Sequence, residues 1–444
     1  MPTKLEPQTA GEGAGSDDVL MDVRDLEVHF ALRGGIVSRF TGGPAGAVRA
    51  VDGVTFQLHK GEVLGLVGES GSGKTTLGRA LLGLVPATGG SIRYAGRELV
   101  GLGERRMRPL RRDLQMAFQD PHASLNPSMD LQTAIGHPLR IHGMAGSDAE
   151  LREKVTGALE RVGLAPVERF LTKFPADLSG GQKQRAVFAR ATIMDPKLVV
   201  ADEPASMLDM SVRAKIIELM QGLKRELGLT YVYITHDLAT AKFFCDRIAI
   251  MYLGRIVELG PTAEIFANPR HPYTRSLLAA VPEPDPRAEV SREVPRGEVP
   301  DAAVRPAGCS FHPRCPKAFA VCGWEGRDLR ALLEQRWTEL TEEAYLAESA
   351  QFADLAALDG QVGTVTVPAA SGHDGEEVAA RLRRIRDEQT DEPLWRGVTD
   401  IAASGTHATV VFHAGTDPTL TETGPVEVAC HLHDPQYQSQ APGT

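Results

Sequence analysis

Cysteine is scarce in this chain of 444 residues, which contains only five. Three of the five fall in one stretch, GCSFHPRCPKAFAVC, at residues 308–322. Long apolar runs are absent too: none reaches the ~18–20 residues of a membrane-spanning helix, and the polar beginning of the chain does not resemble a signal peptide. We therefore expect a cytosolic protein, in which clustered cysteines indicate metal or redox chemistry rather than disulfides.

An excess of basic residues is also absent. The formal net charge is -10 and the pI about 5.8, which is not the composition of a nucleic-acid-binding surface. The sequence has no heptad run and no internal repeat. Its composition is otherwise that of an ordinary globular protein, and its length predicts two or three domains with a large apolar core.

Strand-like apolar runs alternate with helical patterns along most of the chain, which predicts a mainly parallel sheet covered by helices. Helices are expected over 148–163, 181–193, 327–357 and 374–388. Late strands are expected in VGTVTVP, ATVVFHA and PVEVACHLH. Residues 1–18 are expected to form a disordered tail, and the stretch 281–308, rich in Pro, Arg and Glu, a linker.

The stretch GESGSGKTT follows the apolar run VLGLV and precedes a helical pattern. Glycines at this spacing let backbone N–H groups converge on phosphate oxygens, with the positive end of the next helix behind them. We expect a nucleotide phosphate site, in which Lys74 pairs with the β- and γ-phosphates and Thr75 ligates Mg²⁺. An ordinary glycine-rich turn is the alternative. The loop residues are Gly68, Glu69, Ser70, Gly71, Ser72, Gly73, Lys74, Thr75 and Thr76.

Polar residues end three further apolar runs. In KLVVADEP, Asp202 is a candidate Mg²⁺ ligand and Glu203 a candidate base for the attacking water. Gln119 follows a second run and His236 a third. Taken alone, each has a plainer interpretation, because buried strands often end in a carboxylate and single His or Gln residues are often structural.

The stretch LSGGQKQR offers a second anion site, because Ser179 and two glycines open a helix with free N–H groups. A serine-capped helix is the alternative interpretation. Two such sites on one chain reach one ATP only if two copies face each other head-to-tail.

Together, GESGSGKTT, Gln119, LSGGQ, LVVADE, SMLD and THD resemble the nucleotide-binding subunit of an ATP-binding cassette (ABC) transporter over about residues 20–325, plus a short piece near 430. The resemblance implies an α/β fold: an ABC-type P-loop ATPase core (a RecA-like parallel sheet with an antiparallel β-subdomain), an inserted helical subdomain and a C-terminal α+β extension. Within it we expect an ATP-binding core (19–110 and 194–265), a helical subdomain with the Gln119 loop and signature motif (111–193) and an extension with the cysteines (266–325). The residue patterns outside the resemblance add the disordered tail (1–18) and a small α/β unit (326–444), which returns Cys430 and is longer than the family pattern.

The same resemblance implies roles for single residues. Gln119 would contact Mg²⁺ and sense the permease, and His236 would clamp the γ-phosphate. Phe40 is a candidate for stacking on adenine. Met207 stands where the family more often has Ala. The residues expected to act on ATP held by the opposing subunit, or at the interface with it, are Ser179, Gly180, Gly181, Gln182 and Asp209.

QDPHASLNP and NPRHPYTRSLLAAVP resemble the dipeptide and oligopeptide importer branch. This implies a transport ATPase at the cytoplasmic face of the cell membrane, with two permease subunits and, indirectly, an extracytoplasmic substrate-binding protein. A related second ATPase subunit is favoured over an identical one, and nucleic acid is not expected as a partner. The alternative is a non-transport ABC ATPase acting on nucleic acid or ribosomes. The part after residue 325 is also a candidate regulatory module.

The branch ends in a GC-x-F-x-x-RC pattern with two further cysteines, which here are Cys309, Cys315, Cys322 and Cys430. In some members such cysteines hold a [4Fe–4S] cluster, which requires four thiolates. Four sulfurs also suit Zn²⁺, and three nearby histidines keep zinc open; free thiols are the third alternative. Those histidines are His312, His431 and His433. Cys245, in an apolar helical pattern, is expected to be a core thiol.

Overall fold

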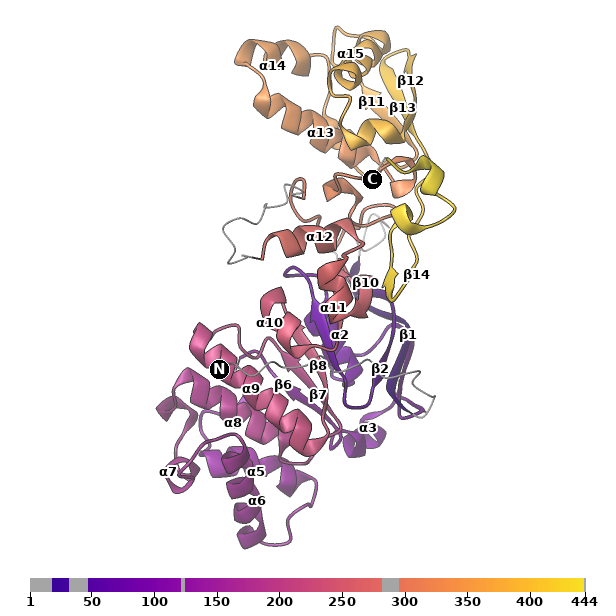
Figure 1. The fold of residues 1–444 in the computed structure, drawn as a ribbon. Helices are drawn as coiled ribbons and strands as arrows, with labels where there is room; N and C mark the ends of the chain where they lie inside the picture. Colours follow the sequence, from indigo (N-terminus) through magenta and orange to yellow (C-terminus); the bar gives the residue numbers. More distant parts are fainter. Residues whose placement is uncertain (1–17, 32–46, 121–123, 282–294, 443–444) are drawn as a thin grey trace, which may run out of the picture.

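The computed structural model of the chain describes residues 18–31, 47–120, 124–281 and 295–442 (Figure 1). The expected disordered tail lies outside these ranges except for its last residue, and so does part of the expected linker. None of the helices in the described ranges combines the length and hydrophobicity needed to span a membrane.

The centre of the fold is an eight-stranded sheet in the order β14-β15-β10-β9-β3-β8-β7-β6. Five neighbouring strands are parallel: β9 (Arg247–Tyr252), β3 (Val63–Val67), β8 (Thr230–Thr235), β7 (Leu198–Asp202) and β6 (Leu114–Ala117). Every residue of β3, β7 and β8 is buried. Both faces of the sheet are therefore covered, which explains why these strands read as unbroken apolar runs.

Successive residues of β8 enter different cores, as the two-residue period of a strand requires. Val232 and Ile234 pack in one core with α2 (Lys74–Leu81). Tyr231 and Tyr233 pack in the other with α10 (Leu238–Phe244). The long helix α9 (Met210–Leu227) contributes buried Ile216 and Met220 to this second core.

A second, antiparallel sheet has the order β2-β1-β4-β5. Its strands are β1 (Val19–Ala31), β2 (Ala47–His59), β4 (Gly89–Tyr94) and β5 (Arg97–Glu98). Met21, Val23 and Leu58 pack in the same core as α2. The helix that follows the glycine-rich loop is thus enclosed between two sheets.

Helices connect β6 to β7 at one end of the molecule (Figure 1). The expected helices over 148–163 and 181–193 are confirmed as α6 (Asp148–Arg161) and α8 (Gly180–Thr192). They pack with α5 (Leu131–Ile141) through buried side chains such as Ile135, Val155 and Val187. The short helix α7 (Glu168–Leu171) also contacts α5, while α3 (Glu104–Leu110) precedes β6.

The opposite end of the molecule is a small unit with a three-stranded sheet, β11-β13-β12, and the helix α15 packed against it (Figure 1). Its elements are α13 (Gly326–Glu339), α14 (Glu342–Ser349), β11 (Thr364–Pro368), α15 (Gly375–Glu388), β12 (Val398–Ser404) and β13 (His407–Phe412). The helical pattern over 327–357 is divided because Leu340 is extended and the Thr341 hydroxyl caps α14.

After this unit the chain returns to the main sheet. The hairpin of β14 (Thr421–Thr423) and β15 (Val426–Val428) adds to β10 (Arg255–Pro261) by antiparallel pairing. The strand expected in PVEVACHLH is shorter than predicted. It covers only Val426–Val428, because the chain then bends into a short helical turn at His431–His433. Between β10 and the small unit, α11 (Thr262–Ala267) and α12 (Pro272–Ala279) lead into the cysteine-bearing segment.

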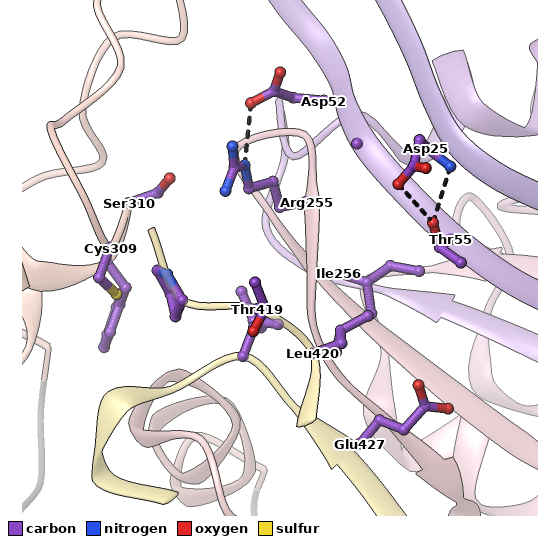
Figure 2. A pocket seen from close by; sticks show the side chains of 15 residues that line it. Asp25, Asp52, Thr55, Arg255, Ile256, Cys309, Ser310, Thr419, Leu420 and Glu427 are labelled. Carbon is purple, nitrogen blue, oxygen red and sulfur yellow. Dashed lines mark hydrogen bonds and ion pairs between the residues drawn. The ribbon is translucent and has the colours of Figure 1, made fainter. Parts of the chain in front are cut away.

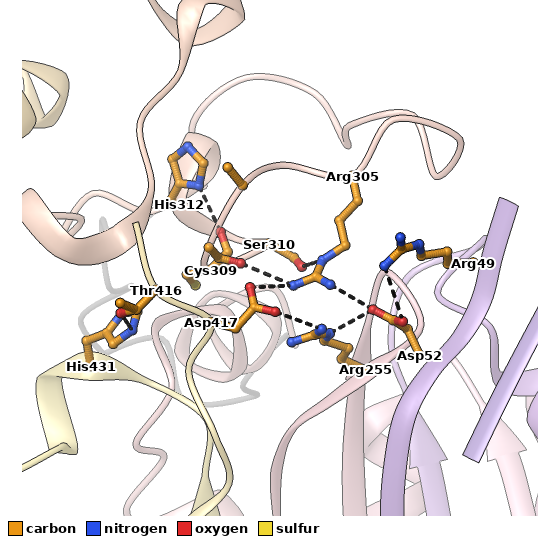
Figure 3. A network of polar contacts seen from close by, with 12 residues as sticks. Arg49, Asp52, Arg255, Arg305, Cys309, Ser310, His312, Thr416, Asp417 and His431 are labelled. Carbon is orange, nitrogen blue, oxygen red and sulfur yellow. Dashed lines mark hydrogen bonds and ion pairs between the residues drawn. The ribbon is translucent and has the colours of Figure 1, made fainter. Parts of the chain in front are cut away.

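A network of ion pairs connects the antiparallel sheet, β10 and the chain that follows the small unit (Figure 3). Asp52 on β2, 5% exposed, pairs with Arg255 of β10 at 3.0 Å and with Arg305 at 2.7 Å. Both arginines also reach Asp417 at 3.0 and 2.8 Å; Asp417 lies on the returning segment, which we define as the residues after the small unit, 413–442. Burial by itself raises the pKa of Asp52, but the arginine charges outweigh it and hold the pKa below its usual value.

The small unit can be tested through its own core, because the three tryptophans of the chain lie between residues 324 and 395. Leu382 on α15 is fully buried. Leu382→Ala is expected to destabilise the unit by about 2–5 kcal/mol, because it leaves a cavity. Urea unfolding followed by tryptophan fluorescence should show a lower midpoint. Arg384→Ala, at an exposed position of the same helix, is the control and should change stability by at most about 0.5 kcal/mol; equal midpoints for the two variants contradict the prediction.

Candidate functional site

The carboxyl ends of four parallel strands meet at one edge of the main sheet. The glycine-rich loop follows β3, Asp202 ends β7, and Glu203 comes directly after it. His236 follows β8, and Gln119 lies two residues beyond β6. Parallel pairing of these strands brings together residues that lie far apart in the sequence, at the position where ligands bind in open α/β sheets.

The glycine-rich loop is wrapped around the side chain of Lys74, which is only 5% exposed. The Nζ atom donates hydrogen bonds to the carbonyl oxygens of Gly68 and Glu69, both at 2.8 Å, and to Ser72 Oγ at 3.4 Å. Burial lowers the pKa of Lys74, while the carboxylates of the site, Glu203 foremost, oppose this shift. The loop thus holds a buried ammonium group at its centre, as phosphate binding requires.

At two positions of the loop the surrounding atoms leave room only for glycine. A Cβ atom on Gly68 would overlap the carbonyl oxygen of Met251. Gly73 has a φ of +98°, and a Cβ atom there would overlap the carbonyl oxygen of Ala50. The loop is therefore packed tightly between the end of β9 and the β2 strand.

The first turn of α2 contacts the end of β7. The hydroxyl of Thr75 donates to Asp202 Oδ1 at 3.0 Å. Burial raises the pKa of Asp202, and the hydrogen bond from Thr75 opposes this. Hydroxyl and carboxylate oxygens are the ligands that Mg²⁺ prefers, so this pair fits the cation that accompanies a nucleoside triphosphate.

Glu203 lies between the two other predicted residues. Its Oε2 accepts from Gln119 Nε2 at 3.1 Å, and its Oε1 lies 3.1 Å from His236 Nδ1. The backbone of Glu203 has a φ of 43°, a conformation rare for residues other than glycine and often found at functional sites. Its N–H bonds the carbonyl of Ile234 at 2.9 Å, which fixes this conformation against β8.

The comparisons with known proteins agree with this geometry. Residues 51–206 match the ABC transporter family, and residues 257–322 match the oligopeptide/dipeptide transporter C-terminal region. The chain is 46% identical over 306 residues to the oligopeptide transport ATP-binding protein OppF of Escherichia coli (strain K12), covering 68% of this chain and 90% of that protein. It is 44% identical over 312 residues to AppF of Bacillus subtilis (strain 168), covering 70% and 93%. The chain belongs to the ATP-binding subunits of ABC transporters.

This ABC ATPase also matches a solved dimeric bacterial ABC transporter cassette, with 28% identity and a TM-score of 0.48, over 55% of this chain and 98% of that chain. Membership of the family establishes an ATPase that acts as a dimer with membrane permease subunits. The expected fold class, an ABC-type P-loop ATPase with a C-terminal extension, is confirmed.

The signature helix of the ABC ATPase begins at an exposed residue. Ser179 caps α8: its hydroxyl accepts from the N–H of Gln182, whose side chain accepts from the N–H of Ser179. Gly180 is exposed too, so this helix start is open to a second molecule. In the neighbouring SMLD segment Met207 is 75% exposed and Asp209 caps α9, whose first residue, Met210, is 85% exposed.

Sequence reasoning overlooked a further aromatic residue. Phe40, the candidate for stacking on adenine, lies outside the described residues. Phe30, at the end of β1, is 46% exposed and pairs with Val48 of β2. Val48 is two residues before Ala50, whose carbonyl touches the phosphate loop at Gly73. An aromatic residue at the end of the first strand, before a glycine-rich connection, was the available signal.

The four predicted cysteines lie in one region, although about a hundred residues separate the last two in sequence. Burial raises the pKa of Cys322 and Cys430, and the proximity of Cys309 and Cys315 raises both further. The N–H of Cys309 bonds the carbonyl of Cys322 at 2.9 Å. None of the four forms a disulfide. Cys245 is buried elsewhere in the core, as expected of a core thiol.

Single-ion coordination is not evident at the thiols. Among the described residues, no group of three or more Cys, His, Asp or Glu side chains is arranged around one metal ion. His312 has hydrogen-bond partners at both ring nitrogens, the Cys309 carbonyl at 2.8 Å and Asp328 at 3.0 Å. His433 Nε2 bonds the carbonyl of Arg270 at 3.1 Å, and His431 Nδ1 lies 3.8 Å from Cys322 Sγ.

Cys309 also lines a cavity of about 380 Å³ between the antiparallel sheet, β10 and the returning segment (Figure 2). Ile256, Phe311 and Leu420 form part of its apolar wall, while Asp25 contributes a carboxylate. One of the four thiols, that of Cys309, thus lies at the junction between the cassette and its C-terminal extension.

Proposed function

We propose that this ABC ATPase hydrolyses ATP to drive the import of oligopeptides or dipeptides through separate permease subunits. The hydrolytic part of the proposal is carried by one observation, the Glu203 carboxylate held between Gln119 and His236 beside the Thr75–Asp202 pair. The cargo is supported by the match of residues 257–322 and by the oligopeptide relatives.

Within the site, each group would have a distinct role. Lys74 and backbone N–H groups of the glycine-rich loop would bind the phosphates of ATP, and Thr75, Asp202 and Gln119 would hold Mg²⁺. Mg²⁺ supplies charge neutralisation at the β- and γ-phosphates. Glu203 accepts a proton from the attacking water, and His236 orients Glu203 and contacts the γ-phosphate.

The proposed role of Glu203 predicts that Glu203→Gln lowers ATP turnover at least about 100-fold, because an amide cannot accept the proton. ATP binding should remain, since the phosphate loop is unchanged. Phosphate release and equilibrium ATP binding measure the two effects separately. Glu218→Gln, at an exposed position of α9, is the control and should retain turnover. Undiminished turnover in Glu203→Gln contradicts the assignment.

Two such subunits would enclose ATP between them. The exposed N-terminus of α8, with Ser179, Gly180, Gly181 and Gln182, would bind the γ-phosphate of ATP held by the opposing subunit. Exposed Met207 and Met210 support a contact surface at the SMLD segment, where Asp209 lies. The opposing subunit is proposed to be a related chain, with an identical one as the alternative. ATP binding then closes a dimer that has two stable arrangements, and hydrolysis reopens it.

The ATPase would lie at the cytoplasmic face of the cell membrane and contact the two permease subunits through the segment around residues 119–127, of which 121–123 lie outside the described residues. A substrate-binding protein on the far side of the membrane would deliver the cargo. We propose no nucleic-acid partner, in keeping with the net charge of -10.

Phe30 is proposed to stack on the adenine ring, in place of Phe40. Its exposure at the strand end beside the phosphate loop supports this role. Phe30→Ala should weaken ATP binding by about 1–3 kcal/mol, the usual value of base–aromatic stacking. Fluorescence titration with a labelled ATP measures this change. Phe30→Trp should retain the affinity; if Phe30→Ala binds ATP as the unmodified chain does, another residue contacts the adenine.

Cys309, Cys315, Cys322 and Cys430 are proposed to hold a [4Fe–4S] cluster. Four thiols that lie close enough to raise each other's pKa, three of them on buried residues and Cys430 on a partly buried one, fit the ligand number of such a cluster. Zinc is less well supported, because it requires its ligands within ~2.3 Å of one point and no such group occurs among the described residues. When bound, the cluster supplies iron–thiolate bonds that cross-link the extension to the returning segment.

The cluster proposal predicts about four iron and four sulfide per chain after purification without oxygen. Iron, sulfide and zinc are quantified on the same sample. Cys430→Ser should lower the iron content, whereas Cys245→Ala should not, because Cys245 lies apart from the four thiols. Zinc alone, or no metal, contradicts the proposal.

A further inference from the structure

Glu69, the second residue of the phosphate loop, is held by two residues of the C-terminal extension. Arg314 Nη1 donates to Glu69 Oε2 at 2.8 Å and Arg314 Nη2 to Glu69 Oε1 at 3.2 Å. The backbone N–H of Glu69 donates to the hydroxyl of Tyr273 at 2.9 Å. A guanidinium that contacts both oxygens of a carboxylate fixes its orientation as well as its charge.

Arg314 is itself fixed in place. Its side chain is 9% exposed, against 30% for Glu69. The guanidinium lies 5.9 Å from the ring centroids of both Tyr252 and Phe311. These rings and Tyr273 contact one another, with centroids 4.8–5.3 Å apart. The ion pair therefore joins the loop to a packed aromatic cluster rather than to a mobile surface side chain.

Glu69, which Arg314 holds, also contacts Lys74 at the centre of the loop. The carbonyl oxygen of Glu69 accepts from Lys74 Nζ at 2.8 Å. A displacement of Glu69 would therefore displace a hydrogen-bond partner of Lys74. Loss of the Arg314 charge would also weaken phosphate binding, because a Glu69 carboxylate without its arginine would place an uncompensated negative charge beside the phosphates.

We propose that Arg314 is a positioning residue for ATP binding, which acts through Glu69 on the phosphate loop and Lys74. The inference rests on the proposed role of Lys74 in binding the phosphates, and goes beyond it by assigning part of the ATP affinity to the C-terminal extension. The turn that carries Cys309 and Cys315 also carries Arg314, so the cysteine-bearing segment is in direct contact with the nucleotide site.

The test measures the Kd for ATP, together with KM and kcat, in matched variants. Arg314→Ala should raise the Kd and KM for ATP at least about tenfold, the loss expected for a hydrogen-bonded charge pair. The kcat at saturating ATP should change less than about twofold, because Glu203 is untouched. Arg314→Lys should give a Kd for ATP between that of the unmodified chain and that of Arg314→Ala, because lysine keeps the charge but loses the two-point contact.

Two further variants separate this role from damage to the extension. Adding Glu69→Gln to Arg314→Ala should restore part of the ATP affinity, because it removes the uncompensated charge; a purely structural role of Arg314 would not produce this rescue. Arg327→Ala removes an arginine of α13 that binds Glu325 and the backbone carbonyls of Val304 and Arg305 in the extension, and should leave the Kd unchanged. Equal effects of Arg314→Ala and Arg327→Ala, or no rescue by Glu69→Gln, overturn the proposal.

Lys74→Ala distinguishes failure of this inference from failure of the site assignment. If Lys74→Ala loses ATP binding while Arg314→Ala binds ATP normally, only the positioning role of Arg314 is wrong. If Lys74→Ala binds ATP normally, the role of the loop itself is wrong, and the inference about Arg314 fails with it.

Discussion

The parallel pairing of β3, β8 and β7 determines where the glycine-rich loop, Asp202, Glu203 and His236 of the nucleotide site lie. In this register Val67 is opposite Thr235 and Asp202 is opposite Ile234, so the three strands end at the same level. The glycine-rich loop, Glu203 and His236 are therefore neighbours without any local sequence relation. Slipping one strand by a residue would turn its side chains to the opposite face and separate Asp202 from Thr75.

The C-terminal extension is joined to the cassette by charges in two places. Asp52, Arg255 and Arg305 connect the antiparallel sheet to β10 and the extension, and Arg314 contacts the phosphate loop. Both contacts are partly or wholly buried, where screening by water and salt is weak. The extension thus contacts the glycine-rich loop itself as well as the antiparallel sheet.

How much the sequence predicts depends on whether a feature is local. The positions of Lys74 and Thr75 were predictable because they end a glycine-rich loop that follows an apolar strand, and that of Glu203 because it directly follows another; strand ends meet at one edge of a parallel sheet. Phe30 was not identified, because its exposure depends on how β1 pairs with β2. The contact of Arg314 with Glu69 was also beyond sequence reasoning, since the two residues are 245 positions apart and meet only through tertiary packing.

The returning segment has a consequence for the order in which the protein is completed during synthesis. Cys430 and β15 lie within the last 20 residues of the chain, after the whole small unit. The main sheet consequently lacks β14 and β15, and the cysteine site its fourth thiol, until the whole small unit has been synthesised. An incomplete chain exposes the edge of β10, which is open to pairing with other chains.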